Sequence, residues 1–189
     1  MQLYNMNLKQ QYTKKIQPEL MKELEIKNLH ATPALDKVVL NVGLGRASQH
    51  TNFKDKILPG VIEELALISG QKPAPRPAKK SIAGFKLREG NIVGASSTLR
   101  GQRMYDFVEK LITTVIPRLR DFRGIDLKSV DESGSLNLGF KDQMVFAEIN
   151  PDTSHVDFGL QITVVPTTRN REEAILLYRK LGFLFKKTT

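Results

Sequence analysis

Two glycines and a serine follow the first strongly apolar stretch of the chain, at a spacing that could bind a phosphate group. Residues 42–48 read VGLGRAS, so Gly43, Gly45 and Ser48 nearly match the glycine fingerprint of dinucleotide-binding turns. Ser48 replaces the third glycine, and the acid about 20 residues further on, Glu63, falls inside a predicted helix. A nucleotide-binding enzyme using the Gly43 and Gly45 turn is therefore the alternative hypothesis. The favoured interpretation is a strand exit with positive φ angles.

Other residue types that support catalysis are absent or scattered. The chain contains no cysteine, which excludes disulfides, thiolate nucleophiles and Cys-type zinc sites. Its three histidines, His30, His50 and His155, stand in unrelated segments without the spacing of paired metal ligands. Neither a P-loop nor a hydrolase nucleophile motif occurs. The sequence predicts a protein that is not an enzyme and uses no cofactor or metal.

Positive charge is concentrated in one part of the chain. The 189 residues carry a formal net charge of +9, from 29 Lys and Arg against 20 Asp and Glu. Residues 72–103 hold eight basic residues and one acid, which is +7 of that total. Residues 126–157 hold seven acids and two basic residues, a balance of −5. The basic stretch predicts a polyanionic partner, whereas the acidic stretch is either a solvated surface or a docking site for a basic protein.

Residues 72–91 are predicted to form an exposed basic loop, because three prolines at alternate positions exclude a helix and permit at most an edge strand. The loop contains KKSIAGFKLR, in which four cations accompany one aromatic residue, Phe85. Cations neutralise phosphates while an aromatic ring stacks on a base or ribose. Either the loop contacts RNA, or it is a mobile solvated loop with Phe85 packed in the core. A similar patch, RLRDFRG at 118–124, fits helix capping equally well.

Alternating apolar residues predict strands, and apolar residues at helical spacing predict helices between them. The strands are expected at residues 36–45, 91–100, 157–165 and, shorter, Val145–Ile149. The helices are expected on either side of Pro18, from Pro59 to Ser69 or Gly70, from Met104 to Pro117, and from an Asn170 cap to Gly182. This order predicts an α+β fold, with a single mixed, largely antiparallel sheet and helices packed on one face. We expect one domain over 1–189, with 1–35 as an N-terminal helical part.

The outer face of the predicted sheet carries short uncharged polar groups. These residues, with one arginine among them, are Asn41, Ser96, Thr98, Arg100, Gln161 and Thr163. Such groups let phosphates and 2′-hydroxyls approach closely, whereas long Lys and Glu side chains would hold an RNA backbone away. The face is therefore either an RNA contact or an ordinary solvated sheet face.

Several longer motifs resemble one known family. In chain order they are VVLNVGLG, LALISGQKP, KKSIAGFKLREG, TLRGQRMYDFVEKLI and PRLRDFRG. From about Asp36 to the C-terminus the sequence resembles the universal fifth protein of the large ribosomal subunit. The resemblance implies a structural, 5S rRNA-binding protein of the central protuberance that also touches peptidyl-site tRNA and bridges to the small subunit. The implied partners are 5S rRNA, 23S-type rRNA, P-site tRNA, the small-subunit head protein thirteen and neighbouring 5S-associated proteins.

The resemblance also assigns residues, motif by motif. The 5S rRNA contacts would be Asn41, Gln71, Thr98 and Arg100. The tRNA-contacting loop would use Lys79, Lys80, Ser81, Phe85, Lys86 and Arg88. The subunit bridge would use Asp131, Glu132 and Asp142, within a region where DESGSLNL and FAEI depart from the family's DGRGNY and FPEI. The Pro59 and Gly60 pair also interrupts a helix that relatives usually continue. A general single-strand RNA chaperone is a further alternative.

The chain shows neither a signal-peptide run nor the roughly 20 apolar residues of a membrane span. Together with the family resemblance, which implies a ribosomal location, this predicts a cytoplasmic protein without membrane contact; an organellar ribosome is the alternative.

Overall fold

The computed structural model describes residues 6–50, 52–85, 87–120, 122–152, 154 and 156–186. Its strands are β1 (Leu35–Gly43), β2 (Ala74–Pro77), β3 (Ile92–Leu99), β4 (Leu136–Phe140) and β5 (Leu160–Pro166). Its α-helices are α1 (Leu8–Gln11), α2 (Gln17–Glu23), α3 (Leu58–Ser69), α4 (Gly101–Lys110), α5 (Ile116–Arg118) and α6 (Arg171–Leu181). The π-helical turns are η2 (Tyr12–Ile16), η5 (Phe53–Ile57) and η7 (Leu111–Val115). The 3₁₀ turns are η3 (Leu29–Ala31), η4 (Ala47–Gln49), η6 (Ala83–Phe85), η8 (Leu127–Ser129) and η9 (Gln143–Val145).

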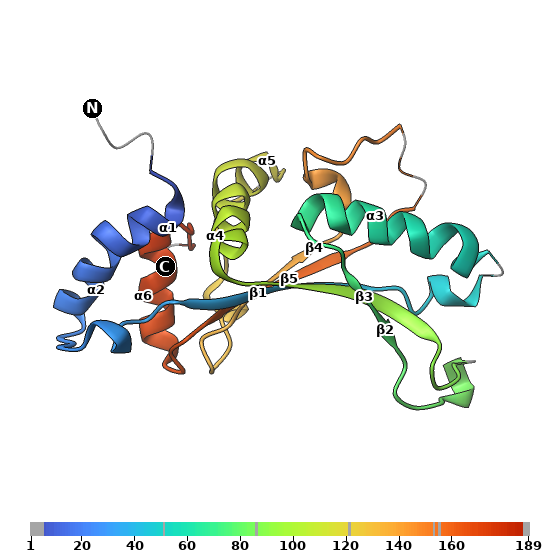
Figure 1. Ribbon diagram of the computed structural model, residues 1–189, viewed down its shortest axis with the longest axis horizontal. Coiled ribbons are helices and arrows are strands. Elements are labelled where there is room, and N and C mark those ends of the chain that lie inside the picture. The colour runs from blue at the N-terminus through green and yellow to red at the C-terminus, as the bar shows by residue number, and fades with distance from the viewer. Residues whose placement is uncertain are drawn as a thin grey trace. The chain divides into compact units, whose positions relative to one another are not determined.

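The strands form one antiparallel sheet in the order β2-β3-β1-β5-β4 (Figure 1). In β1 the side chains of Val38, Leu40 and Val42 are completely buried, whereas Asn41 is exposed. This alternation of buried and exposed residues is the period of a strand with one buried face. The predicted α+β fold with a single sheet is confirmed.

The chain divides into two compact units. Unit 1 comprises residues 1–38, 100–138 and 163–189, and unit 2 comprises residues 39–99 and 139–162. Strands β1, β4 and β5 each begin in one unit and end in the other. This division does not test the expectation of a single domain over 1–189, which stays a prediction.

In unit 1 the N-terminal helices pack with α4 and α6 (Figure 1). The predicted start and stop of α6 are confirmed: the Asn170 side chain accepts a hydrogen bond from the backbone N–H of Glu172, and Gly182 ends the helix with φ of 104°. Tyr178 of α6 is fully buried, and its hydroxyl lies 2.9 Å from the carbonyl oxygens of both Gly134 and Val164. Burial raises the pKa of the Tyr178 hydroxyl.

In unit 2, helix α3 packs on β3. Its buried residues Val61, Leu65 and Ile68 recur at helical spacing, and Gly70 ends the helix with φ of 65°, as the sequence predicts. Strand β2 pairs antiparallel with β3 and lies at the edge of the sheet, so residues 74–77 of the predicted loop form the edge strand that the prolines permit.

A buried amide, that of Gln143, connects separate parts of unit 2. Gln143 is completely buried; its Nε2 donates to the Val156 carbonyl oxygen at 2.7 Å, and its Oε1 accepts from the Phe158 N–H at 3.0 Å. The strand predicted at Val145–Ile149 is wrong, because η9 and a turn occupy that stretch. The strand lies earlier, as β4, where the apolar periodicity of the sequence is weak.

The glycines after β1 also differ from expectation. Gly43 and Gly45 do not have positive φ angles, so the predicted reason for them is wrong. A Cβ added at either position would meet no atom within 4 Å. Local geometry therefore gives no steric reason for glycine at these positions.

Candidate nucleic-acid interface

Three of the residues expected to contact 5S rRNA lie in unit 2, on or beside neighbouring strands. Asn41 is exposed on β1, and Thr98 is half-buried near the end of β3. Gln71 follows α3, and its Nε2 donates a hydrogen bond to the Thr98 carbonyl oxygen at 3.3 Å. The turn holding Gln71 is fixed in part by Ser69, whose hydroxyl donates to the Gln71 carbonyl oxygen at 2.8 Å. The fold thus brings Gln71 and Thr98 together from segments 27 residues apart.

Ser96 does not belong to the accessible polar face. It is only 5% exposed, and its hydroxyl oxygen accepts a hydrogen bond from Nε of Arg76. Arg76 reaches it from the edge strand β2, which pairs with β3. The expectation of an exposed Ser96 is wrong, because the pairing of β2 with β3 places the Arg76 side chain over the Ser96 hydroxyl.

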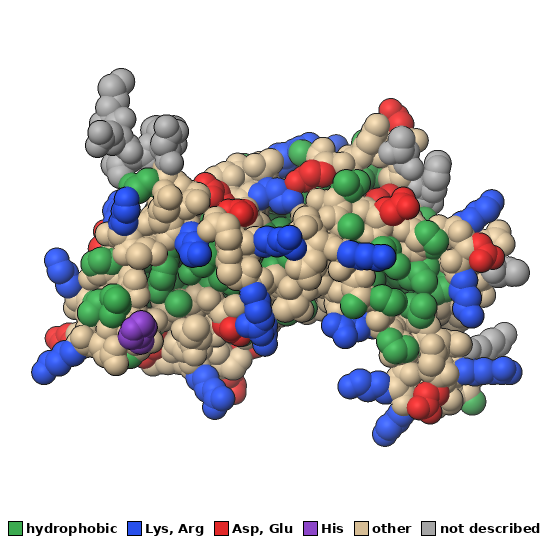
Figure 2. Space-filling view, viewed as in Figure 1, with side chains coloured by type: hydrophobic (Ala, Val, Ile, Leu, Met, Phe, Trp, Pro, Cys, Tyr) green, Lys and Arg blue, Asp and Glu red, His purple; other side chains and the backbone are tan. Residues whose placement is uncertain are grey.

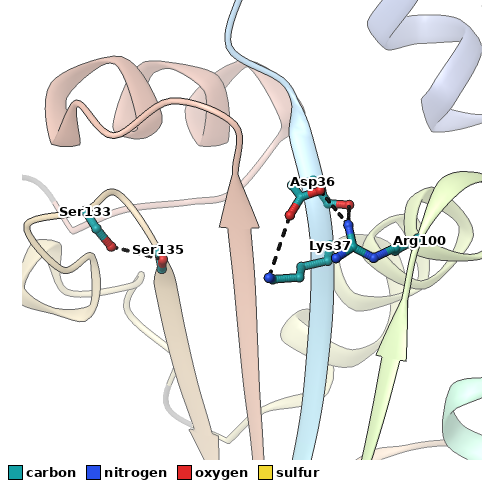
Figure 3. Close-up of polar contacts among 5 residues, drawn as sticks. All are labelled: Asp36, Lys37, Arg100, Ser133 and Ser135. Carbon is teal, nitrogen blue, oxygen red and sulfur yellow. Dashed lines mark hydrogen bonds and ion pairs between the residues drawn. The ribbon is translucent and has the colours of Figure 1, made fainter.

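The fourth residue of this set, Arg100, lies in unit 1 directly before α4. Its side chain is 57% exposed, and its Nη1 lies 2.6 Å from Oδ1 of Asp36 and 3.4 Å from the Asp36 carbonyl oxygen (Figure 3). Oδ2 of Asp36 lies 3.8 Å from Nζ of Lys37. Arg100 is therefore accessible to a ligand and already paired with a carboxylate, which the sequence analysis did not foresee.

The basic loop is exposed and braced by hydrogen bonds. Lys79, Lys80, Ser81 and Arg88 are exposed, and Figure 2 shows Lys and Arg side chains around the loop that joins β2 and β3. Phe85 at its tip is 69% exposed, so the alternative of Phe85 packed in the core is wrong. Lys86, also assigned to this loop, lies outside the described residues.

Several contacts fix the shape of this loop. Ile82 and Leu87 form an antiparallel bridge, and the Ser81 hydroxyl oxygen accepts the Glu89 N–H at 2.9 Å. From outside the loop, Nε2 of Gln49 donates to the Phe85 carbonyl oxygen at 3.1 Å. The loop is thus a closed turn with cations around an exposed aromatic tip. The role of Gln49 could not be predicted, because no local sequence pattern marks a partner 36 residues away.

The acids expected at the subunit bridge are divided between the units. Asp131 in unit 1 accepts hydrogen bonds from the Ser133 hydroxyl and the Ser135 N–H, at 2.8 and 2.7 Å, and the two serine hydroxyls lie 3.3 Å apart (Figure 3). Glu132 beside it is exposed. Asp142 in unit 2 accepts the Met144 N–H at 2.9 Å, as the cap of η9. Both aspartates therefore hold local turns and still present negative charge.

The second basic patch, at 118–124, begins at the end of α5. Arg118 lies in the last turn of α5, and both alternatives for this patch, helix capping and RNA contact, stay predictions. Gly124 has φ of 102°, and an added Cβ would lie 2.8 Å from the backbone N of Lys186. Glycine is required there because the C-terminal segment passes too closely for a side chain.

The alternative enzymatic sites gain no support. Glu63 lies within α3, as the sequence predicts, and not after a second strand. Among the residues that the structure describes, which do not include His155, no three or more His, Cys, Asp or Glu side chains could hold a metal ion together.

Comparison with known proteins identifies the family. Residues 28–88 match the family described as Ribosomal protein L5, and residues 92–185 match the C-terminus of the same ribosomal family. Relatives named Large ribosomal subunit protein uL5 come from Synechococcus sp. (strain RCC307), Desulfatibacillum aliphaticivorans and Anaeromyxobacter sp. (strain K). The chain is 47%, 48% and 47% identical to these, over 96%, 95% and 95% of its own length and 99%, 98% and 98% of theirs.

The chain belongs to the uL5 family of large-subunit ribosomal proteins. The resemblance inferred from the sequence motifs is thereby confirmed. The uL5 family is structural and non-enzymatic, so the prediction that the chain is not an enzyme is also confirmed. RNA binding within a ribonucleoprotein follows from membership of the uL5 family. In the described part of the chain, no helix is both long and apolar enough to cross a membrane.

Proposed function

We propose that this uL5-family protein binds 5S rRNA and attaches it in the central protuberance, against the 23S-type rRNA. Asn41, Gln71 and Thr98 of unit 2 and Arg100 of unit 1 make the 5S contacts. The observation that carries the proposal is the Gln71 and Thr98 pair, in which a hydrogen bond to the Thr98 carbonyl oxygen holds the Gln71 carboxamide beside the end of β3. Short polar groups of this kind suit phosphates and 2′-hydroxyls at close approach.

The basic loop contacts peptidyl-site tRNA through Lys79, Lys80, Ser81, Phe85, Lys86 and Arg88. The exposed cations and the 69% exposed Phe85 ring support this part of the proposal, because phosphate neutralisation and base stacking need accessible groups. The Ser81 hydroxyl accepts the Glu89 N–H and keeps its own hydrogen for a donor bond.

Asp131, Glu132 and Asp142 supply negative charge to the bridge with the basic small-subunit head protein thirteen. The local hydrogen bonds of Asp131 and Asp142 hold their carboxylates in place, which supports charge pairing at an interface. Neighbouring 5S-associated proteins complete the set of partners.

Filter binding at physiological salt tests the central proposal. We expect 5S rRNA to bind more tightly than an unrelated structured RNA of the same length, with a log-log salt slope of roughly 0.7 to 0.9 for each neutralised phosphate. Equal affinity for the two RNAs would contradict the proposal. Tighter binding of an unstructured RNA would instead favour a general RNA chaperone. Detection of the protein in the large-subunit fraction of a sucrose gradient provides the cellular control.

A further inference from the structure

An acidic residue stands beside the arginine proposed to contact RNA. Asp36 lies near the start of β1, 64 residues before Arg100, and the tertiary fold brings the two side chains into contact. Oδ1 of Asp36 lies 2.6 Å from Nη1 of Arg100, while Oδ2 lies 3.8 Å from Nζ of Lys37 (Figure 3). The carboxylate therefore lies between two cations on an exposed surface of unit 1.

The contacts of Asp36 engage one edge of the guanidinium group. Both the carboxylate and the carbonyl oxygen of Asp36 face Nη1, at 2.6 and 3.4 Å. A guanidinium group has five N–H donors in a rigid planar fork, so an acceptor on Nη1 leaves donors on the other nitrogens to meet a phosphate or a base edge. The Arg100 side chain is 57% exposed, which gives a ligand access to it.

We infer that Asp36 is a positioning residue that gives Arg100 its selectivity for the 5S rRNA over other RNA. This inference rests on the proposed contact between Arg100 and 5S rRNA. Asp36 fixes the plane of the guanidinium group before RNA arrives, and its charge offsets part of the attraction that Arg100 exerts on any phosphate.

Only the first of these effects distinguishes one RNA from another. Ordering a long side chain at an interface costs about 0.5 to 1.5 kcal/mol, which corresponds to about 2- to 10-fold in affinity. Because Asp36 already orders the Arg100 side chain, an RNA whose shape fits the fixed guanidinium group binds without this ordering cost. Unrelated RNA gains little from a fixed orientation, whereas the carboxylate beside the cation weakens the attraction of Arg100 for both RNAs. The ordering of Arg100 before RNA arrives therefore raises the ratio of the two dissociation constants.

Filter binding with Asp36→Asn tests the inference. The measured quantity is the ratio of the dissociation constant for an unrelated structured RNA to that for 5S rRNA. We expect Asp36→Asn to lower this ratio by about 2- to 10-fold, with a steeper salt slope for both RNAs. Asp36→Glu keeps the charge on a longer side chain and is expected to restore most of the ratio.

Glu23→Gln is the charge-matched control. Each substitution removes one carboxylate and raises the formal net charge from +9 to +10. Glu23 lies in α2 and pairs with Lys180, which keeps its second partner Glu19 at 3.2 Å. A general electrostatic effect would change both variants alike, whereas the inference requires the ratio to fall only for Asp36→Asn.

A double-mutant cycle completes the test. In an Arg100→Gln background, Asp36→Asn should leave the ratio unchanged, because Asp36 acts through Arg100. Circular dichroism confirms folding of each variant, and loss of an exposed ion pair leaves the fold intact. If the parent protein prefers 5S rRNA but Asp36→Asn keeps the same ratio, the inference fails alone. If the parent protein shows no preference for 5S rRNA, the proposed function is wrong, and the inference about Asp36, which depends on it, is wrong as well.

Discussion

Nε2 of Gln49 donates a hydrogen bond to the carbonyl oxygen of Phe85, across 36 residues of sequence, at 3.1 Å. The bond ties the tip of the basic loop to η4. Gln49→Ala removes the side-chain amide that makes this hydrogen bond, so the variant should keep its core and have a more mobile basic loop. We expect backbone exchange at Ile82 and Leu87 to become about 2- to 10-fold faster, as for loss of one hydrogen bond of about 0.5 to 1.5 kcal/mol. Hydrogen exchange measured by NMR checks this.

Gln102→Ala is the matched control for that experiment. Its amide donates to Asp106 within α4 at 2.7 Å, in the other unit. Exchange in the loop should stay unchanged in this variant. Unchanged exchange in Gln49→Ala as well would show that the loop holds its shape without the tether.

Removing the paired lysines of the basic loop should separate its two proposed RNA contacts. Lys79→Ala with Lys80→Ala is expected to spare 5S rRNA binding and to weaken tRNA binding on assembled ribosomes. The salt slope of tRNA binding should fall by about 1.4 to 1.8, from two phosphates at roughly 0.7 to 0.9 each. Lys14→Ala with Lys15→Ala removes two exposed lysines from η2 and controls for net charge. Equal loss of 5S rRNA and tRNA binding would contradict the division between sheet and loop.

The buried amide of Gln143 should be required for stability. Gln143→Leu leaves the Val156 carbonyl oxygen and the buried Phe158 N–H without their partner. We expect the free energy of unfolding to fall by about 3 kcal/mol, because each unpaired buried group costs about 1 to 3 kcal/mol. Urea denaturation measures the change. Gln161→Leu, at an exposed position of β5, should stay within about 0.5 kcal/mol of the parent protein. A decrease of only about 0.5 kcal/mol in the free energy of unfolding of Gln143→Leu would contradict the prediction and would mean that the residues around Gln143 repack.

Tyr178 should make stability depend on alkaline pH. Burial raises the pKa of its hydroxyl above the ordinary value of 10.0, so the folded protein keeps a proton that the unfolded chain loses. The stabilisation is complete below pH 10 and declines as pH rises from 10 towards the folded pKa, by about 1.4 kcal/mol per pH unit.

Tyr178→Phe isolates this contribution. At pH 8 the variant should be about 1 to 3 kcal/mol less stable, because the carbonyl oxygens of Gly134 and Val164 lose their donor. The difference should shrink between pH 10 and 11, since phenylalanine does not titrate. Urea denaturation at pH 8, 10 and 11 measures it. A difference that stays constant over this range would contradict the assignment.

Much of the fold could be predicted because it rests on neighbouring residues. Buried and exposed residues alternate along β1, and α6 starts at Asn170 and stops at Gly182, because period and capping are properties of a few consecutive residues. The strand expected at Val145–Ile149 failed for the opposite reason. The buried Gln143 side chain forms hydrogen bonds with residues 11 to 15 positions further along the chain. A pattern of neighbouring residues does not include these partners, so it could not predict the conformation of this segment.

The sequence by itself determined the family, the α+β class and the exposed basic loop, since motif order, periodicity and charge are written along the chain. The tertiary structure decided which polar side chains a ligand can reach. Ser96 is covered by Arg76 from β2, and Arg100 meets Asp36 from the start of β1. Strand pairing sets these contacts between residues 20 and 64 positions apart, and the accessibility of a side chain depends on such distant neighbours more than on its own type.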